Sequence, residues 1–308
     1  PNAYQVIGQQ DTVVTPMGTT PIFTGSSAFS GDDGPNDLSF STNKKMVVDT
    51  NNHRLFVQDR TANRVLIFNL DADNELIDRV ADNVIGQSDF TSAGASPTQS
   101  SFQATVGLAY DMDNDRLFVG DANRVLLFDV RPAGSPAQSL CGFISTGLSN
   151  GMSASCVFGQ SDFTSNGSGN VGLPAIIAIN ALAYDSVHDR LFVSSAQPTE
   201  KIRVYDLSGA IANNMATTYD VGNAYFYVRV VDIAYDSLRE RLFVAVDRIE
   251  EESSTWGSIV WVYDVATITP YENPVNVLGT VNTQTNEGIL TDDHIADDNQ
   301  CTEDNNYP

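Results

Sequence analysis

Residues 111–129 read DMDNDRLFVGDANRVLLFD, and this stretch decides the fold because near copies of it recur along the chain. The string Arg-Leu-Phe-Val begins at Arg54, Arg116, Arg190 and Arg241. Each arginine lies five residues after an aspartate, and a second apolar run such as residues 125–128 follows each string. A unit that occurs four times in one chain is typical of a repeat architecture.

Each repeat is predicted to form four short antiparallel strands. In the second repeat, residues 107–110, 117–119 and 125–130 are apolar runs, and residues 156–159 form a fourth run after an insertion. The segments between the first three runs are rich in Asp, Asn and Gly, which favour tight turns because Asp and Asn hydrogen-bond to their own backbone. Helical periodicity is absent. Four short strands joined by turns are typical of a propeller blade.

The sequence therefore predicts an all-β fold, a β-propeller of about four four-stranded blades, in a single domain over residues 1–308. The repeats span residues 44–87, 103–160, 178–222 and 229–279. Residues 1–9 are expected to form a surplus outer strand, and residues 280–308 an acidic linker or tail.

The repeat resembles the NHL-type β-propeller repeat. The resemblance rests on the order Gly-Gln-Ser-Asp-Phe-Thr-Ser (residues 86–92 and 159–165), Gly-Leu-Ala-Tyr-Asp (107–111), Asp-Arg-Leu-Phe-Val (115–119) and Asn-Arg-Val-Leu-Leu-Phe-Asp (123–129). It is most similar to the version found in long arrays in bacterial cell-surface and secreted proteins. It covers most of the chain, and it is weak at residues 10–43 and 280–308. The resemblance implies a propeller fold and says little about chemistry.

The charge of the chain excludes two classes of partner. It carries 16 basic and 39 acidic side chains, a net charge of −23. Nucleic acids and anionic membranes are bound through Lys and Arg patches that replace counterions, so nucleic-acid binding is excluded. No run reaches the roughly 18 apolar residues that span a bilayer, so membrane insertion is not expected. High acidic charge and few lysines fit an extracellular or cell-surface protein.

Four Asp–Arg pairs are expected to face each other across the first turn of each repeat. They are Asp49/Arg54, Asp111/Arg116, Asp185/Arg190 and Asp236/Arg241. Because the pair recurs in every repeat, we interpret it as a structural turn clasp and not as an active site. Surface pairs of this kind contribute about 0–1 kcal/mol each.

The outer strand with the Val-Ile-Gly pattern occurs once more than the three-strand core, because residues 3–8 precede the first core. An unpaired edge strand invites pairing with another chain. Three explanations stay open: the chain is part of a longer array, the strand closes the ring against the last blade, or it completes a blade on a neighbouring subunit by strand exchange. The residues expected in assembly are Tyr4, Val6, Ile7 and Gly8, with Asp292, Asp293, Asp297 and Asp298 of the tail as a second contact.

Catalytic signals are weak. His53 and His188 fall in the equivalent turn of different repeats, so we interpret both as turn residues and not as bases. The chain has no Gly-x-Ser-x-Gly elbow and no His/Cys cluster with zinc spacing. We therefore expect no catalytic residues and no enzymatic activity.

Calcium is the one cofactor that the sequence raises. Asp111, Asp113 and Asp115 alternate as the first three ligands of a calcium loop do. Arg116 and Ala122 stand where such a loop carries Gly and Glu, so a solvated acidic turn is favoured and no cofactor is expected.

Two covalent features are expected. Cys141 and Cys156 flank an insertion rich in Gly, Ser and Ala, and a disulfide between them would contribute about 3 kcal/mol on the chain-entropy model. Cys301 is left over, either as a free thiol or paired with another chain. Asn166 begins an Asn-Gly-Ser glycosylation sequon in a loop that should be exposed.

Together these features favour an extracellular structural or adhesive scaffold that self-associates, into a filament or surface array, through propeller edges and loops. Its main partner would be itself, with glycans or other surface proteins as further partners. The alternative is a monomeric propeller that binds carbohydrate or protein. A metal-dependent hydrolase like the lactonases among six-bladed relatives is less favoured. Such an enzyme needs polar ligands on the inner strands, which here read as apolar runs such as residues 46–48 and 108–110.

Overall fold

The computed structural model describes residues 7–8, 12–15, 18–21, 34–41, 45–167, 176, 178–196, 201–221, 229–247, 258–268, 270 and 273–279. In these ranges the chain forms strands and turns and no helix, so the all-β prediction is confirmed. Its contacts divide the chain into two compact units. Unit 1 comprises Pro1–Gly167 and Ala212–Asn214, and unit 2 comprises Ser168–Ile211 and Met215–Pro308. The expectation of one continuous domain stays a prediction.

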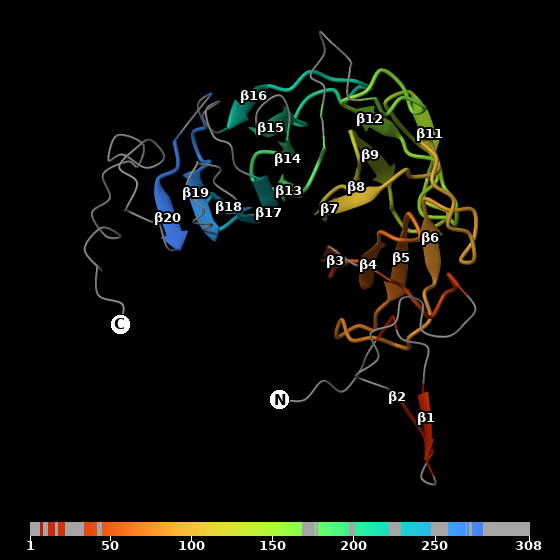
Figure 1. Cartoon of the computed structure of the whole chain (residues 1–308). Coiled ribbons are helices and arrows are strands. Elements are labelled where there is room, and N and C mark those ends of the chain that lie inside the picture. Colours follow the sequence, from red (N-terminus) through yellow and green to blue (C-terminus); the bar gives the residue numbers. More distant parts are fainter. Residues whose placement is uncertain are drawn as a thin grey trace, which may run out of the picture. The chain divides into compact units, whose positions relative to one another are not determined.

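Unit 1 contains two four-stranded antiparallel sheets (Figure 1). Blade 1 consists of β3 (Met46–Asp49), β4 (Arg54–Asp59), β5 (Arg64–Asn69) and β6 (Asn83–Ile85). Blade 2 consists of β7 (Thr105–Asp111), β8 (Arg116–Asp121), β9 (Arg124–Asp129) and β12 (Cys156–Phe158). In both blades the strands pair with their neighbours in chain order.

Unit 2 contains two further sheets of the same kind. Blade 3 consists of β13 (Leu182–Asp185), β14 (Arg190–Ser195), β15 (Lys201–Asp206) and β16 (Tyr219–Val221). Blade 4 consists of β17 (Arg229–Asp236), β18 (Arg241–Asp247), β19 (Ser258–Asp264) and β20 (Asn276–Gly279). Meandering four-stranded sheets are the blades of a β-propeller, so the predicted fold class is confirmed.

Two hairpins lie outside the repeated pattern and were not expected from the sequence. The first joins β1 (Thr12–Thr15) to β2 (Gly18–Pro21). The second joins β10 (Gln138–Leu140) to β11 (Phe143–Ser145), between the third and fourth strands of blade 2. A disulfide joins Cys141, in the turn of this second hairpin, to Cys156 at the start of β12. The turn of the inserted hairpin is therefore tied covalently to the outer strand of blade 2.

The turn between the first two strands has the same conformation in all four blades. The residue before the clasp arginine has a positive φ each time: His53 (51°), Asp115 (52°), Asp189 (50°) and Glu240 (52°). In blade 1, Oδ1 of Asp49 accepts hydrogen bonds from the backbone amides of Asn51 and Asn52 at 3.0 Å each. Short polar side chains favour this backbone, which explains the turn chemistry of the repeat.

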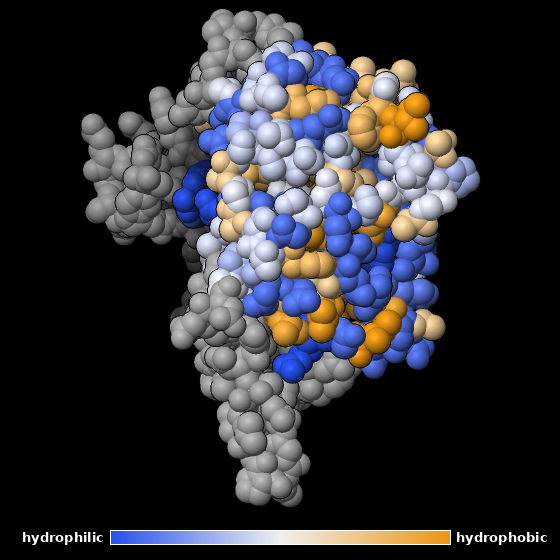
Figure 2. Space-filling view, turned by 90° about the vertical axis from the view of Figure 1, so that its right-hand side faces the viewer, coloured by the Kyte–Doolittle hydropathy of each residue, from blue (hydrophilic) through white to orange (hydrophobic). Residues whose placement is uncertain are grey.

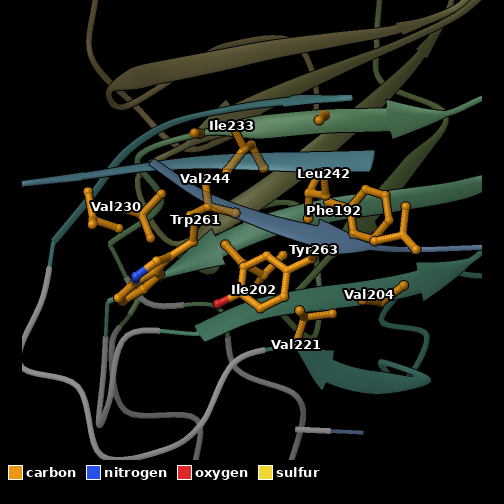
Figure 3. Close-up of a cluster of buried hydrophobic side chains, with 14 of the residues drawn as sticks. Phe192, Ile202, Val204, Val221, Val230, Ile233, Leu242, Val244, Trp261 and Tyr263 are labelled. Carbon is orange, nitrogen blue, oxygen red and sulfur yellow. The ribbon is translucent and has the colours of Figure 1, made fainter. Parts of the chain in front are cut away.

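Apolar side chains fill the space between consecutive blades within each unit. In unit 2, Phe192, Ile202, Val204 and Val221 of blade 3 lie against Val230, Leu242, Val244, Trp261 and Tyr263 of blade 4 (Figure 3). In unit 1, Phe56, Val65, Ile67 and Ile85 of blade 1 pack against Leu117, Val119, Leu126 and Phe128 of blade 2. Each fully buried side chain of this size contributes about 1.5–3 kcal/mol. The core thus joins the two blades of each unit.

Exposed apolar residues are scattered over the outer surface. Figure 2 looks onto the side where β6 and β11 lie in Figure 1, and shows small apolar areas among hydrophilic ones. Ile77 and Ile144 are the most exposed isoleucines of the described residues, at 63% and 67%. Single exposed apolar side chains are ordinary on protein surfaces, so this side does not by itself indicate a binding site.

Candidate functional site

The first three Asp–Arg clasps are buried, contrary to the prediction that they are surface pairs. The arginine Nε lies 2.9 Å from the aspartate Oδ2 in Asp49/Arg54, 2.5 Å in Asp111/Arg116 and 2.7 Å in Asp185/Arg190. All three aspartates have no exposed surface, and the arginine side chains are at most 10% exposed. The sequence could not predict this burial, because the contacts of Arg54 and Arg190 include groups of the next blade.

A clasp arginine also binds the next blade. Nη1 of Arg54 in blade 1 donates to the carbonyl oxygen of Val130, which follows β9 in blade 2, at 2.5 Å. Nη2 of Arg190 in blade 3 donates to the carbonyl oxygen of Val265, which follows β19 in blade 4, at 2.6 Å. The clasp therefore closes a turn and holds two consecutive blades together.

The fourth clasp is not formed as predicted. Arg241 pairs with Asp264, which lies opposite it on β19, at 2.7 Å. Asp236 pairs with Arg239 at 3.3 Å instead. The Arg241 side chain is 33% exposed, and no residue described in the chain covers it as Val265 covers Arg190. In blade 4 the predicted Asp236–Arg241 clasp is therefore open, and Arg241 is partly exposed.

Two of the buried clasp carboxylates, Asp49 and Asp185, have lowered pKa values. Burial raises the pKa of Asp49, but hydrogen bonds from the backbone of Asn52 and from the Arg54 guanidinium lower it by more. Burial likewise raises the pKa of Asp185, and hydrogen bonds from Tyr235 and Arg190 outweigh that effect. Both carboxylates are therefore charged at neutral pH and serve structure.

We expect the fold to lose stability as the pH falls below about 4. A carboxylate whose pKa is lower in the folded chain stabilises it above the unfolded pKa of about 3.9, and this contribution is lost as the pH falls through the folded pKa. Asp49→Asn should lower the melting temperature at pH 7 and flatten its decline below pH 4. Exposed Asp113→Asn is the matched control. Equal melting temperatures of the wild type at pH 7 and pH 2 would contradict this.

Two further buried Asp–Arg clasps were not predicted from the sequence. Arg64 lies 2.9 Å from Asp59, and Arg124 lies 2.7 Å from Asp121, and all four side chains have no exposed surface. Arg64 donates to the carbonyl oxygens of Ser39 (2.8 Å) and Phe90, and Arg124 donates to those of Ser101 (2.9 Å) and Phe163. Each arginine thus joins the segment before its blade to the segment after it. The shared Asn-Arg pair at the start of β5 and β9 was the available signal.

The Gly-Gln-Ser-Asp-Phe-Thr-Ser segments are linkers between blades. Nε2 of Gln87 donates to the carbonyl oxygens of Ala62, Asn63 and Gly94, and Gln160 Nε2 binds those of Asn123 and Gly167. Asp89 and Asp162 accept hydrogen bonds from the following Thr and Ser residues, which lower the pKa of both carboxylates. The Gln and Asp side chains of this motif are therefore already used in hydrogen bonds to nearby groups of the chain.

Ile7 and Gly8, the two described residues of the predicted surplus outer strand, lie against blade 1 and the segment before it. Gly8 forms a parallel bridge with Ser39. Ile7 packs against a buried cluster that includes Val57, Leu66, Phe68 and Val84 of blade 1. The other predicted assembly residues, Tyr4, Val6, Asp292, Asp293, Asp297 and Asp298, lie outside the described residues.

The weak calcium candidate is not assembled. Asp111 is bound to Arg116, and Asp115 accepts hydrogen bonds from Arg54 and from the hydroxyl of Tyr110. In the described part of the chain, no group of three or more His, Cys, Asp or Glu side chains is placed to hold a metal ion. Asp111 therefore belongs to the clasp of blade 2, and Asp115 to the joint between blades 1 and 2.

The remaining candidates also make structural contacts. His53 Nδ1 lies 2.9 Å from Asn74 Oδ1, and His188 Nδ1 lies 3.2 Å from Asp185 Oδ2. Asn166 is only partly exposed, because its Oδ1 accepts from the backbone of Asn123 and its Nδ2 donates to Gln103 at 2.8 Å. Glycosylation at Asn166 stays a prediction and would require the Gln103 contact to break.

No protein-family model and no curated protein matches the chain. The solved structures similar to it include hydrazine synthase of Kuenenia stuttgartiensis, at 11% identity and a TM-score of 0.44, over 80% of this chain and 50% of that chain. A putative 6-phosphogluconolactonase of Bacteroides uniformis is 12% identical, with a TM-score of 0.44, over 78% and 58%. U3-55K is 12% identical, with a TM-score of 0.43, over 77% and 64%. This chain thus spans less than two thirds of each structure, and its fold is assigned from its own strand topology.

No described segment is a helix long and apolar enough to cross a membrane.

Proposed function

We propose that this chain is an extracellular structural scaffold built of NHL-type repeats, and that it self-associates through the open sides of its blades. Its mechanism is recognition between copies and not bond-making. The clasp side chains support this, because they are engaged in holding blades together.

One observation carries the proposal. Each of the four blades has its own outer strand, and Ile7–Gly8, which forms a bridge at Gly8, is additional to these four. Gly8 (φ +82°) lies against the ring of Phe40 as Gly86 (φ +88°), at the end of the blade 1 outer strand, lies against that of Phe102. Ile7–Gly8 therefore occupies the place of a preceding blade's outer strand. A second copy can supply the three inner strands of that blade.

Two features support an extracellular location. The Cys141–Cys156 disulfide favours an oxidising compartment, because cytosolic thiols are kept reduced. The net charge of −23 keeps the folded chain soluble without lysine-rich surfaces. Calcium is not part of the proposal.

The proposal is tested by the mass and shape of the purified protein. We expect sedimentation velocity to show species that grow with concentration, and negative-stain electron microscopy to show linear or ordered assemblies. A single species with the mass of one chain, 33.3 kDa, at all concentrations would contradict self-association. That result would favour the alternative, a monomeric propeller that binds carbohydrate or protein.

A further inference from the structure

We propose that blade 4 of one copy docks on blade 1 of a second copy through the same contacts that join consecutive blades within each unit. This inference rests on the proposed self-association and names the two surfaces that meet. Blade 4 presents the side that would face a next blade, and blade 1 presents the side that would face a preceding one.

The chain shows twice what covers the side facing the next blade. In unit 1, Arg54 donates to the carbonyl of Val130, and the Phe56 ring lies 5.4 Å from that of Tyr110. In unit 2, Arg190 donates to the carbonyl of Val265. The ring of Phe192 there lies 6.2 Å from that of Tyr235. An arginine and a phenylalanine from the same strand thus bind the next blade in both units.

The equivalent residues of blade 4 are Arg241 and Phe243, and both are partly exposed. Along β18, burial alternates: Leu242, Val244 and Val246 are buried, whereas Phe243 and Ala245 are not. In β14 of blade 3, every residue is buried. One face of β18 therefore packs on blade 3, and the other has the residues of a blade-to-blade joint without their partner.

Blade 1 has exposed apolar side chains at the positions that another blade would cover. Met46 and Val48 are 52% and 44% exposed. The repeat aligns Met46 with Leu108 and Ile233, which are each only 1% exposed. Val48 aligns with Tyr110 and Tyr235, the two tyrosines that receive the phenylalanine of the preceding blade. The positions that are covered in blades 2 and 4 are thus open in blade 1.

Repeat equivalence fixes the register of the joint. The backbone amides of Val130 and Val265 donate to the carbonyls of Asp115 and Glu240, and the amide of Leu70 donates in the same way to that of His53. Leu70 of blade 1 therefore stands where Val130 stands in blade 2. In the joint, Arg241 donates to the Leu70 carbonyl of the second copy, and Phe243 covers Val48.

The outer strands must exchange when the joint forms. Leu278 of β20 is 45% exposed at the position where Ile85 of blade 1 is fully buried. In the second copy Ile7–Gly8 already holds that position, so both strands cannot occupy it. Ile7-Gly8 therefore replaces the similar Leu278-Gly279 beside β19. Exchanging one strand for a similar one costs little, as in domain swapping. The contacts of Arg241 and Phe243 with the second copy therefore drive association.

Single charges introduced on either surface test the joint. Val48→Asp and Phe243→Asp should each reduce assembly at least tenfold in concentration, because each would bury an unpaired charge. Ile144→Asp, on the β10–β11 hairpin, is the matched control and should assemble as the wild type does. Circular dichroism melting verifies that each variant is folded. If the two surface variants assemble like the control while the wild type assembles, the joint is wrong and self-association stands.

A gain-of-function variant tests the register itself. Asp115 accepts a hydrogen bond from Arg54 at 3.2 Å in the joint of unit 1, and His53 holds the equivalent place in blade 1. His53→Asp should therefore give Arg241 of the neighbouring copy a carboxylate and tighten assembly about threefold to tenfold. In the double variant His53→Asp/Arg241→Ala this gain should vanish. Unchanged or weaker assembly of His53→Asp would overturn the register.

Cross-linking between copies provides a second readout. In a Cys301→Ser background, chains with Val48→Cys and chains with Phe243→Cys are mixed and treated with a short bis-maleimide. We expect a two-chain product only in the mixture, because the two surfaces meet head to tail. Equal cross-linking of either variant alone would overturn the inference. A wild type that is a single chain at every concentration would overturn both the inference and the proposed function.

Discussion

Replacing Arg64 with alanine is expected to lower the free energy of unfolding by about 3–5 kcal/mol. Arg64 and Asp59 are both without exposed surface and lie 2.9 Å apart. Removing the guanidinium leaves the Asp59 carboxylate buried without its counter-charge, which costs more than the ion pair itself contributes. The carbonyls of Ser39 and Phe90 also lose their donor, so the segments on both sides of blade 1 are released.

The control for Arg64→Ala is Arg239→Ala. The Arg239 side chain is 72% exposed and lies 3.3 Å from Asp236, so its removal should cost about 0–1 kcal/mol. Urea unfolding followed by far-UV circular dichroism measures both, and hydrogen exchange should localise the Arg64 effect to β4 and β5. Arg124→Ala should behave like Arg64→Ala, because the same contacts recur in blade 2. A cost of Arg64→Ala no larger than that of Arg239→Ala would contradict this.

The blades could be predicted because their determinants are local and repeated. Each turn needs only an aspartate that caps the backbone and a residue that tolerates positive φ, and both are visible in sequences such as residues 49–54. Each strand needs only a short apolar run beside such a turn. The β1–β2 and β10–β11 hairpins were missed because they occur once each and carry no repeat.

The role of the charged pairs could not be predicted from spacing. Asp236 and Arg241 have the same spacing as Asp49 and Arg54, and yet only the second pair forms. The difference lies in context: Arg54 reaches a carbonyl of the next blade, whereas Arg241 turns to Asp264 across the strand pair. Burial of a pair is a property of two neighbouring blades, so one repeat read alone cannot reveal it.

Replacing Gly86 with alanine is expected to cost about 2–5 kcal/mol, from two sources. Its φ of +88° disfavours any side chain, and a Cβ there would overlap the ring of Phe102. Phe102 is fully buried in the core of unit 1, and its ring packs edge-on against Phe128, so it cannot move without opening a cavity. Gly134→Ala isolates the first source, because Gly134 has a φ of +77° with no atom near its Cβ position. It should cost about 1–2 kcal/mol, and equal costs for the two variants in urea unfolding would contradict the overlap.

Gly8→Ala introduces the same conflict, with Phe40, in a strand that none of the four blades needs for its own pairing. It should therefore release Ile7–Gly8 and weaken assembly, while urea unfolding changes far less than in Gly86→Ala. Phe40→Ala removes the overlapping ring, so the double variant should recover part of the assembly. Unfolding of Gly8→Ala as severe as that of Gly86→Ala would make Ile7–Gly8 an integral part of unit 1. Ile7–Gly8 would then stay fixed on its own copy, and β20 would be the strand that leaves β19 when the joint forms.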